Sequence, residues 1–371
     1  MQLAKLVGFT FPVPFKVVFR HASASRRRAE NFVVCVTTDS GVVGFGEGCP
    51  RSYVTGESIE SCTRFLLNHQ SSLENLVVDL RTLKQWIETN KHEIDANPSA
   101  FCAIEMAILD ALGKEESKAI EALLGLPHES GVVHYTAVLG DAPYAAYWWM
   151  SRLYIRNGFS DIKIKLSGDS LRDRRKLQLW QRRITDGLRV RLDANNLWTN
   201  WEECIEYLRL LPQVFWGIEE PLQPRDYFGM QQIGSRLGIK LILDESCTRV
   251  EDLDNVCGIS WVLNLRVSKV GGILRAIELA HLAQQNDLGI IVGAHVGETS
   301  LLTRGTLVVL QFLRNRQVAV EGAFGRHLLS ADLSDEVIEF DANANIDLDS
   351  LYVLRNPGSG LHVDKSKLQS L

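Results

Sequence analysis

Charged residues recur at nearly one interval through the second half of this 371-residue chain, and each closes a short apolar run. The positions, spaced 28, 26, 25 and 25 residues apart, are Lys165, Asp193, Glu219, Asp244 and Lys269. A strand that ends in a functional side chain, followed by a helix of about a dozen residues, is the repeating unit of a (β/α) barrel. Because the strand ends of such a barrel meet on one face, the spacing predicts that these five side chains share one pocket.

Three of the five positions are carboxylates, which predicts a metal site. Asp193, Glu219 and Asp244 would offer oxygen ligands and leave room for water or substrate oxygens, the environment that a hard cation prefers. We therefore expect Mg²⁺, with Mn²⁺ as a substitute. Asn195 shares the strand face of Asp193 and would orient a ligand water.

Two lysines stand on one face of the preceding strand. Lys163 and Lys165 alternate with Ile162 and Ile164, and successive strand side chains point to opposite faces. Two ammonium groups at that distance disfavour double protonation, so one lysine is expected to have a lowered pKa and to act as a general base.

Each of these residues also has a plainer interpretation. A strand-end carboxylate often only caps the next helix, and a Lys-x-Lys on a strand is usually an exposed edge. The shared register and the common barrel face favour the metal site over these alternatives. Glu220 and Glu245, each next to an expected ligand, should point the other way and act as supporting residues. Arg266 is a further expected supporting residue.

Composition narrows the class of protein. A chain with 46% apolar residues and a net charge of −5, with both signs dispersed, gives no reason to expect nucleic acid or a membrane as partner. Arg26-Arg27-Arg28 is a compact basic run. Seven scattered cysteines without a Cys-x-x-Cys pair favour reduced thiols, and with no membrane-spanning or signal segment the sequence predicts a cytoplasmic enzyme.

The expected fold class is α/β, a (β/α) TIM-type barrel with an α+β capping domain at the N-terminus that the C-terminal tail completes. The capping domain would cover residues 1–125, the barrel 130–330, and the returning tail 331–371. Strands are expected near 3–9, 15–20, 30–38 and 41–47, a helix from Asn97-Pro98-Ser99, and barrel strands one, seven and eight at 132–139, 290–293 and 318–321.

These residues give the chain a family resemblance. The motifs are Lys163-Ile-Lys165, Asp193-Ala-Asn195, Glu219-Glu-Pro221, Asp244-Glu-Ser246 and Lys269-Val-Gly-Gly272. In this order they resemble the enolase superfamily, specifically its muconate lactonizing enzyme subgroup. Gly44-Phe-Gly-Glu-Gly48 and Val54-Thr-Gly-Glu-Ser58 resemble the capping domain of that subgroup, especially of its dipeptide epimerases.

The resemblance implies a chemistry. In such enzymes Mg²⁺ holds the substrate carboxylate, a lysine removes the proton from the adjacent carbon, and the metal stabilises the enediolate. By position, Asp193, Glu219 and Asp244 would be the metal ligands. Lys165 and Lys269 would be the two acid/base groups on opposite faces of the intermediate, and Lys163 would lower the pKa of Lys165.

Substrate residues are expected in the loops that close over the barrel. The resemblance places Arg20, His21, Arg26, Arg51 and Tyr53 there, with His295 and Glu321 after strands seven and eight. His295 is either a substrate contact or, as in a related subgroup, a rival base. Dipeptide epimerases carry Asp-x-Asp where this chain has Glu321-Gly-Ala323, which weakens the case for a free amino-terminal dipeptide.

The leading hypothesis is a racemase or epimerase that performs 1,1-proton transfer on a small carboxylate substrate, such as a dipeptide or N-acylamino acid. The alternatives are a muconate-type cycloisomerase, and a dehydratase or o-succinylbenzoate synthase-like elimination. A third hypothesis is that the barrel has lost catalysis and serves as a binding or structural protein. A closed homo-oligomer is the expected assembly.

Overall fold

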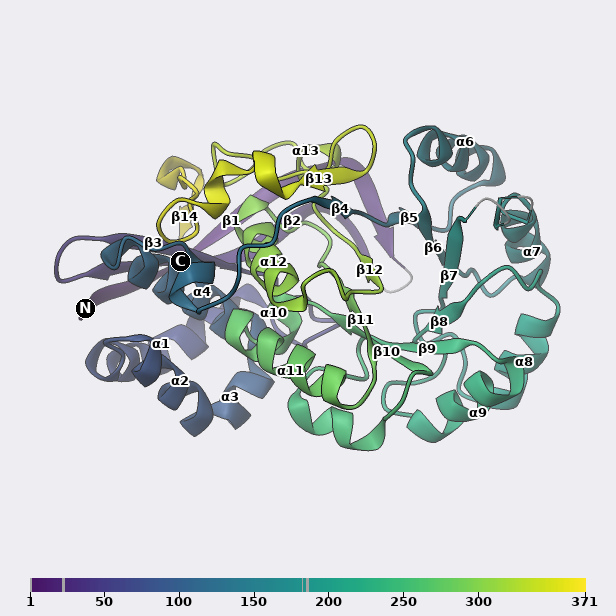
Figure 1. The fold of residues 1–371 in the computed structure, drawn as a ribbon, viewed down its shortest axis with the longest axis horizontal. Helices are drawn as coiled ribbons and strands as arrows, with labels where there is room; N and C mark the ends of the chain where they lie inside the picture. Colours follow the sequence, from purple (N-terminus) through teal and green to yellow (C-terminus); the bar gives the residue numbers. More distant parts are fainter. Residues whose placement is uncertain (1, 22–23, 182, 185–186) are drawn as a thin grey trace.

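The computed structural model describes residues 2–21, 24–181, 183–184 and 187–371, and the side chains of residues 17–26 lie outside the described part. Strands of the first domain gather at one end of the molecule, and a ring of shorter strands surrounded by helices lies at the other (Figure 1). Both termini lie on the first domain (Figure 1).

The first domain is an antiparallel sheet covered by helices. Its sheet has the order β14-β1-β2-β3 in the described chain. The elements are β1 (Leu3–His21), β2 (Ala24–Thr38), β3 (Val43–Gly48), α1 (Ile59–Leu76), α2 (Leu80–Thr89), α3 (Lys91–Ala96), α4 (Pro98–Glu115), α5 (Ile120–Leu123) and, from the tail, β14 (Gln369–Ser370). Ser58 and Asp79 cap α1 and α2. Pro98 opens α4, as the sequence predicts.

One strand replaces two of those expected. The segments near 3–9 and 15–20 form the single strand β1, which passes through Pro12 and Pro14. Beyond Thr10 the ladder with β14 ends, and the far side of β1 has only an isolated bridge from Phe15 to Leu329 and a hydrogen bond from the Ser330 amide to the Pro14 carbonyl among the described residues. Prolines without an N–H are tolerated at such an edge, where no continuous ladder needs their donors.

The glycines of β3 have a packing reason. A Cβ atom on Gly46 would lie 2.1 Å from the carbonyl oxygen of Ala103, and one on Gly44 would lie 2.2 Å from that of Ala107. The backbone of helix α4, which is buried from Pro98 to Gly113, therefore packs directly on β3, and Glu47 of the same strand reaches the second domain.

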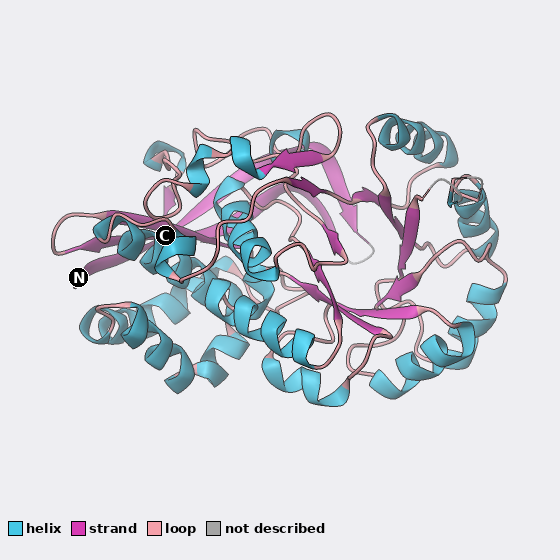
Figure 2. Ribbon diagram, in the orientation of Figure 1, coloured by secondary structure: helices cyan, strands magenta, loops and turns pink. Residues whose placement is uncertain are grey.

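The second domain is a curled parallel sheet with helices outside it (Figure 2). Within the described residues it has eight strands, in the order β12-β11-β10-β9-β8-β7-β6-β5. The strands are β5 (Ala137–Leu139), β6 (Asp161–Lys165), β7 (Arg189–Asp193), β8 (Gly217–Glu219), β9 (Lys240–Leu243), β10 (Trp261–Leu265), β11 (Gly289–Val292) and β12 (Ala319–Val320). The helices are α6 (Tyr144–Arg156), α7 (Ser170–Gln178), α8 (Trp201–Arg209), α9 (Tyr227–Leu237), η2 (Val250–Asn255), α10 (Val267–Val270), α11 (Ile273–Gln285), α12 (Ser300–Leu313) and α13 (Gly325–Leu328).

The first barrel strand is shorter than expected. The segment 132–139 divides into β4 (Val132–His134), which pairs with β13 (Asn345–Asp347) of the tail, and β5, which belongs to the barrel sheet. Between them the amide of Thr136 donates to the carbonyl of Val320 at 2.7 Å, which joins the two ends of the curled sheet.

The tail crosses both domains. After β13 come η3 (Leu348–Ser350), η4 (Tyr352–Leu354) and η5 (Lys365–Lys367), and the chain ends in β14 against β1. The expected fold class, a barrel with an α+β capping domain, is confirmed by this architecture. No helix in the described part of the chain is long and apolar enough to cross a membrane.

Candidate active site

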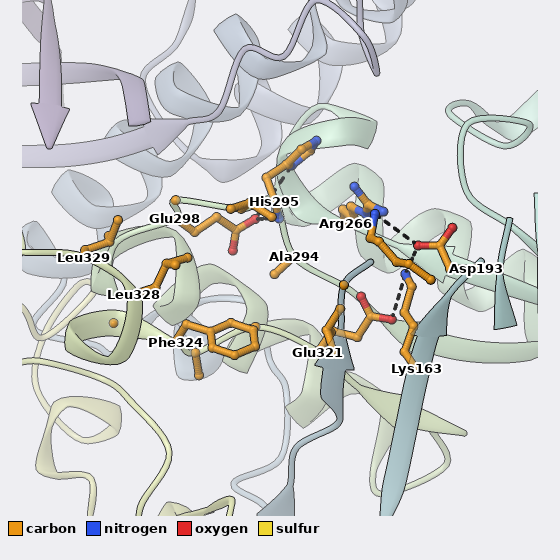
Figure 3. Close-up of a pocket in the computed structure, with 18 of the residues that line it drawn as sticks. Lys163, Asp193, Arg266, Ala294, His295, Glu298, Glu321, Phe324, Leu328 and Leu329 are labelled. Atoms are coloured by element: carbon orange, nitrogen blue, oxygen red, sulfur yellow. Dashed lines mark hydrogen bonds and ion pairs between the residues drawn. The ribbon is translucent and has the colours of Figure 1, made fainter. Parts of the chain in front are cut away.

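Three carboxylates meet at the carboxyl ends of neighbouring barrel strands. Asp193 ends β7 and stands in register with Glu219, which ends β8, while Asp244 follows β9 directly. Each is at most 2% exposed. The expected ligand set is therefore gathered at one edge of the sheet. Of the three carboxylates, Asp193 lines a cavity (Figure 3).

Cationic side chains lie between these carboxylates. Lys163 Nζ is 2.7 Å from Glu219 Oε1 and 3.4 Å from Asp193 Oδ2, and the Arg266 guanidinium contacts Asp244. Among the described residues no group of His, Cys, Asp and Glu converges closely enough to hold a metal as it stands. The cations provide the compensating charge in this structure.

The donor set nevertheless fits a hard cation. All the expected ligands are oxygen donors, and Glu219 Oε2 is buried without a hydrogen-bond partner. Burial opposes ionisation of Asp193, but Lys165 and Lys163 outweigh it and lower the pKa of Asp193 to about 2. Burial raises the pKa of Glu219 to about 8, so this carboxylate has the most to gain from a further positive charge.

The lysine pair of β6 shares one face, as predicted. Lys165 reaches the cavity, where its Nζ donates to Asn195 Oδ1 at 2.9 Å and lies 3.5 Å from Asp193 Oδ2. Burial favours the neutral form of Lys163, yet Glu219, Glu321 and Asp193 outweigh it and raise the pKa of Lys163 above its ordinary value. Lys163 is thus held as an ammonium and is not the lysine with a lowered pKa.

Lys269 stands elsewhere than expected. It lies on the short helix α10, four residues after β10 ends, and its side chain is 0% exposed. Its Nζ donates to Asp244 Oδ1 at 2.9 Å and to the carbonyl oxygens of Asp244 and Asn264. These contacts must loosen before Lys269 can reach a substrate.

The supporting residues divide into two groups. Glu220 points away from the cavity and accepts hydrogen bonds from the amides of Asp244 and Ser246. These bonds fix the turn that carries the Asp244 carboxylate. Glu245 was expected to point away as well, but it lines the cavity. Asn195 has a positive φ of 46° and accepts from Lys165, so here it orients the lysine.

The cavity encloses about 420 Å³ and has a charged end and an apolar end. Figure 3 shows Lys163, Asp193 and Glu321 on one side and Phe324, Leu328 and Leu329 on the other. His295 lines it, is 3% exposed, and neither ring nitrogen has a hydrogen-bond partner. Burial, with the Arg266 and Arg51 guanidinium groups, holds the pKa of His295 well below its usual range, which leaves a neutral imidazole.

The loop residues expected to bind substrate differ in where they lie relative to the cavity. Tyr53 lines the cavity. Arg51 does not: it is 1% exposed, and its guanidinium donates to Asn31 and to the carbonyl oxygens of Glu30, Pro50 and Val296, so it joins the capping domain to the barrel. Arg20, His21 and Arg26 lie among the residues whose side chains are outside the described part.

Sequence reasoning missed two polar residues below the carboxylates. Asn264 donates to Glu219 Oε1 at 3.1 Å, and Arg191 Nη2 donates to Glu321 Oε1 at 2.6 Å. Strand alternation could have found Arg191, because it lies two residues before Asp193 on the same face. Asn264 is the one polar residue of the apolar strand β10, which was a usable indication.

Comparisons with known proteins agree with this architecture. Residues 149–367 match the family described as enolase C-terminal domain-like, and residues 7–125 match the N-terminal domain of mandelate racemase and muconate lactonizing enzyme. An N-succinyl-L-Arg/Lys racemase of Bacillus cereus is 24% identical over 100% of this chain and 98% of its own, and its crystal structure superposes with a TM-score of 0.83. A D-Ala-D/L-Ala epimerase of Cytophaga hutchinsonii is 28% identical over 79% of each chain.

A muconate lactonizing enzyme of Pseudomonas fluorescens, in complex with muconolactone, has the same fold, with a TM-score of 0.83 at 21% identity over 99% of this chain and 98% of its own. The protein is therefore of the class of capped (β/α) barrels that carry carboxylates and lysines at the carboxyl ends of the barrel strands. The chain belongs to the enolase superfamily, in the branch of mandelate racemase and muconate lactonizing enzyme. The expectation of a superfamily enzyme with isomerases as its relatives is confirmed.

Proposed function

We propose that this protein is a Mg²⁺-dependent racemase or epimerase that exchanges the proton next to the carboxylate of an amino-acid derivative. The observation that carries the proposal is the position of Lys165, whose Nζ reaches the cavity beside Asp193 and Asn195. The names of the relatives, among them an N-succinyl-L-Arg/Lys racemase and several dipeptide epimerases, support the same reaction.

The residues of this chain have distinct tasks in that reaction. Lys165, in its neutral form, takes the proton from the carbon next to the substrate carboxylate, and Asn195 holds its Nζ in place. Lys163 stays charged and stabilises the negative charge that develops. Lys269 returns a proton from the opposite face once its contacts with Asp244 have loosened.

Enzymes of this family generally depend on Mg²⁺. Here Asp193, Glu219 and Asp244 would hold the ion, which would bind the substrate carboxylate and stabilise the charge that forms on it. Mn²⁺ is the expected substitute, because it takes the same oxygen ligands.

The test is proton exchange in D₂O with Mg²⁺, followed by NMR, on dipeptides and N-acylamino acids. The wild type should incorporate deuterium at the α-carbon, and Lys165→Ala should lower the rate by about 10²- to 10⁴-fold. Lys114→Ala is the matched control, because Lys114 pairs with the buried carboxylate of Asp110 in the capping domain, away from the cavity. Metal-independent exchange, or full activity in Lys165→Ala, would refute the proposal.

A second candidate is cycloisomerisation of a diacid. Glu321-Gly-Ala323 after β12, in place of an Asp-x-Asp, favours it, as does the common fold with muconate lactonizing enzymes. A lactone product without any epimer would establish this alternative.

Assembly and compartment complete the proposal. Family members act on small-molecule carboxylates, and we expect a closed homo-oligomer from general precedent. The seven cysteines are free, and six are buried, which suits a reducing compartment such as the cytoplasm.

A further inference from the structure

The carboxylate at the end of β12 already has two cationic partners. Glu321 Oε1 lies 2.6 Å from Arg191 Nη2 and 3.3 Å from Lys163 Nζ. Glu321 is 6% exposed and lines the cavity, as Figure 3 shows beside Lys163. A carboxylate so compensated has little attraction left for a further ammonium group.

Arg191 provides this compensation from beneath the cavity. Arg191 pairs with Lys163 in the register of β6 and β7 and lies two residues before Asp193 on the same strand. It is 0% exposed. It also contacts Asp161, whose carboxylate accepts from Thr136 Oγ1 at 2.9 Å. Arg191 does not line the cavity, so it acts on a substrate only through Glu321.

The end of the cavity opposite Glu321 is apolar and is lined by Phe324, Leu328 and Leu329 (Figure 3). Val138, Met150 and Tyr154 also line the cavity. A free ammonium placed there would lose its hydration without a matching anion, whereas an acyl group would bury apolar surface favourably. Glu298 is a further carboxyl group on the wall, but burial raises its pKa to about 8, so it is mostly protonated at neutral pH.

We infer that Arg191 determines specificity: by holding the Glu321 carboxylate, it makes the enzyme select substrates with an acylated nitrogen and an apolar far end over substrates with a free ammonium. This inference rests on the proposed function and narrows its substrate class. In this inference Arg191 is a positioning residue. Its substitution should change the preference between acylated and free-amine substrates, which the loss of a purely structural residue would not do.

A matched pair of compounds isolates the ammonium group. N-propionyl-L-leucine and L-alanyl-L-leucine have the same skeleton and differ at the position that carries the amine. For the wild type with Mg²⁺ we expect kcat/KM for deuterium exchange to be about a hundredfold higher with the propionyl compound. A preference for the free amine, or no preference, would overturn the inference.

Variants test the cause of the preference. Arg191→Met should lower the ratio of kcat/KM for the propionyl compound to kcat/KM for the alanyl compound by at least about tenfold. Arg191→Lys, which keeps the charge, should preserve most of this ratio. A merely structural role would lower both rates and leave the ratio unchanged. Glu321→Gln is the second arm in case Arg191→Met does not fold: the propionyl preference should persist, and a selective loss of alanyl-leucine turnover would overturn the inference by identifying Glu321 as an ammonium site.

Binding separates this inference from the proposed function. Both compounds are also titrated calorimetrically into Lys165→Ala, which reports affinity without turnover. Tighter binding of the propionyl compound with no exchange in the wild type would contradict the proposed reaction alone. Exchange with equal or reversed preference would contradict the inference alone, and binding of neither compound would overturn both.

Discussion

At the scale of single residues, the site is an array of buried opposite charges. Lys163 contacts Asp193, Glu219 and Glu321 within 3.4 Å, while Lys165 has a side chain that is 17% exposed. Removing one partner of a buried pair leaves the other charge uncompensated and costs about 3–5 kcal/mol. Substitution of Lys163 will therefore affect folding as well as chemistry, whereas substitution of Lys165 reports mainly on chemistry.

The metal site can be tested without substrate. Asp193→Asn should weaken Mn²⁺ or Mg²⁺ binding by about 10- to 100-fold or more, because it removes one of three negative oxygen ligands. Mn²⁺ binding is followed by electron paramagnetic resonance, with Mg²⁺ as the competitor. Removal of the metal with a chelator should abolish proton exchange, and added Mg²⁺ should restore it.

Asp173→Asn is the control for metal affinity. Asp173 is also a fully buried carboxylate of the barrel, but it is bound by Ser167, Tyr207 and Lys176 away from the cavity. Equal loss of Mn²⁺ affinity in both variants would mean that the loss reflects general destabilisation, and would contradict the ligand assignment.

At the scale of elements, the turn between α10 and α11 governs Lys269. Gly271 and Gly272 end α10 with φ of 90° and 110°, values that favour glycine. Glu105 of α4 then accepts from the amides of Ile273 and Leu274 and so caps α11 from the other domain. The turn that carries Lys269 is thus held by a residue 164 positions earlier in the chain.

Gly272→Ala should disturb this turn. The new Cβ would lie 2.3 Å from Glu105 Oε2, and the backbone, with ψ of −177°, is in a region essentially limited to glycine. We expect a loss of about 1–3 kcal/mol in the free energy of unfolding and a fall in kcat for exchange, because Lys269 loses its fixed position. Denaturant unfolding and the deuterium assay measure the two effects.

Gly238→Ala provides the matched control for Gly272→Ala. Gly238 ends α9 with φ of 66°, and a Cβ there would meet no atom within 4 Å. This variant should lose about 1 kcal/mol of stability with kcat unchanged. An unchanged kcat in Gly272→Ala would contradict the role of the turn.

The same elements show what the sequence can predict. The positions of the strand-end carboxylates and of the lysine pair could be predicted from the regular spacing of charged residues, and the structure brings these side chains together. The position of Lys269 could not be predicted in this way, because a spacing of 25 residues does not distinguish a strand end from the helical turn that follows it. Arg51 and Glu105 were beyond local reasoning, since their partners, Val296 and Ile273, are 245 and 168 positions away. The domain boundaries expected at 125 and 331 stay a prediction.

At the scale of the whole molecule, buried polar contacts join the two domains. Glu47 of β3 accepts from Thr299 and from the amide of Leu302, and so caps α12 of the barrel. Arg304 of α12 forms two hydrogen bonds of 2.6 Å with Glu121 of α5. These contacts bury the charges of each domain against the other, so neither domain is complete alone and we expect them to unfold together.

Glu47 should make this junction sensitive to pH. Burial raises the pKa of Glu47 from 4.5 to about 7, although hydrogen bonds from Thr299 oppose the shift. Between these values the folded protein retains a proton that the unfolded chain has released. Stability is therefore fully present below about pH 4.5 and is lost as pH rises toward 7, by roughly 3 kcal/mol at most.

Glu47→Gln removes the ionisation and so isolates this contribution. The free energy of unfolding of the wild type minus that of Glu47→Gln should fall between pH 4.5 and 7 and level off above 7, as measured by denaturant titrations across that range. The constant part of the difference has another cause: both oxygens of Glu47 accept hydrogen bonds from N–H donors, which an amide cannot fully reproduce. Glu60→Gln, at an 85% exposed carboxylate of α1, should show no such trend. A difference for Glu47→Gln that is constant or rises with pH would mean that Glu47 is already ionised in the folded protein at pH 4.5, and that the four donors around it outweigh its burial.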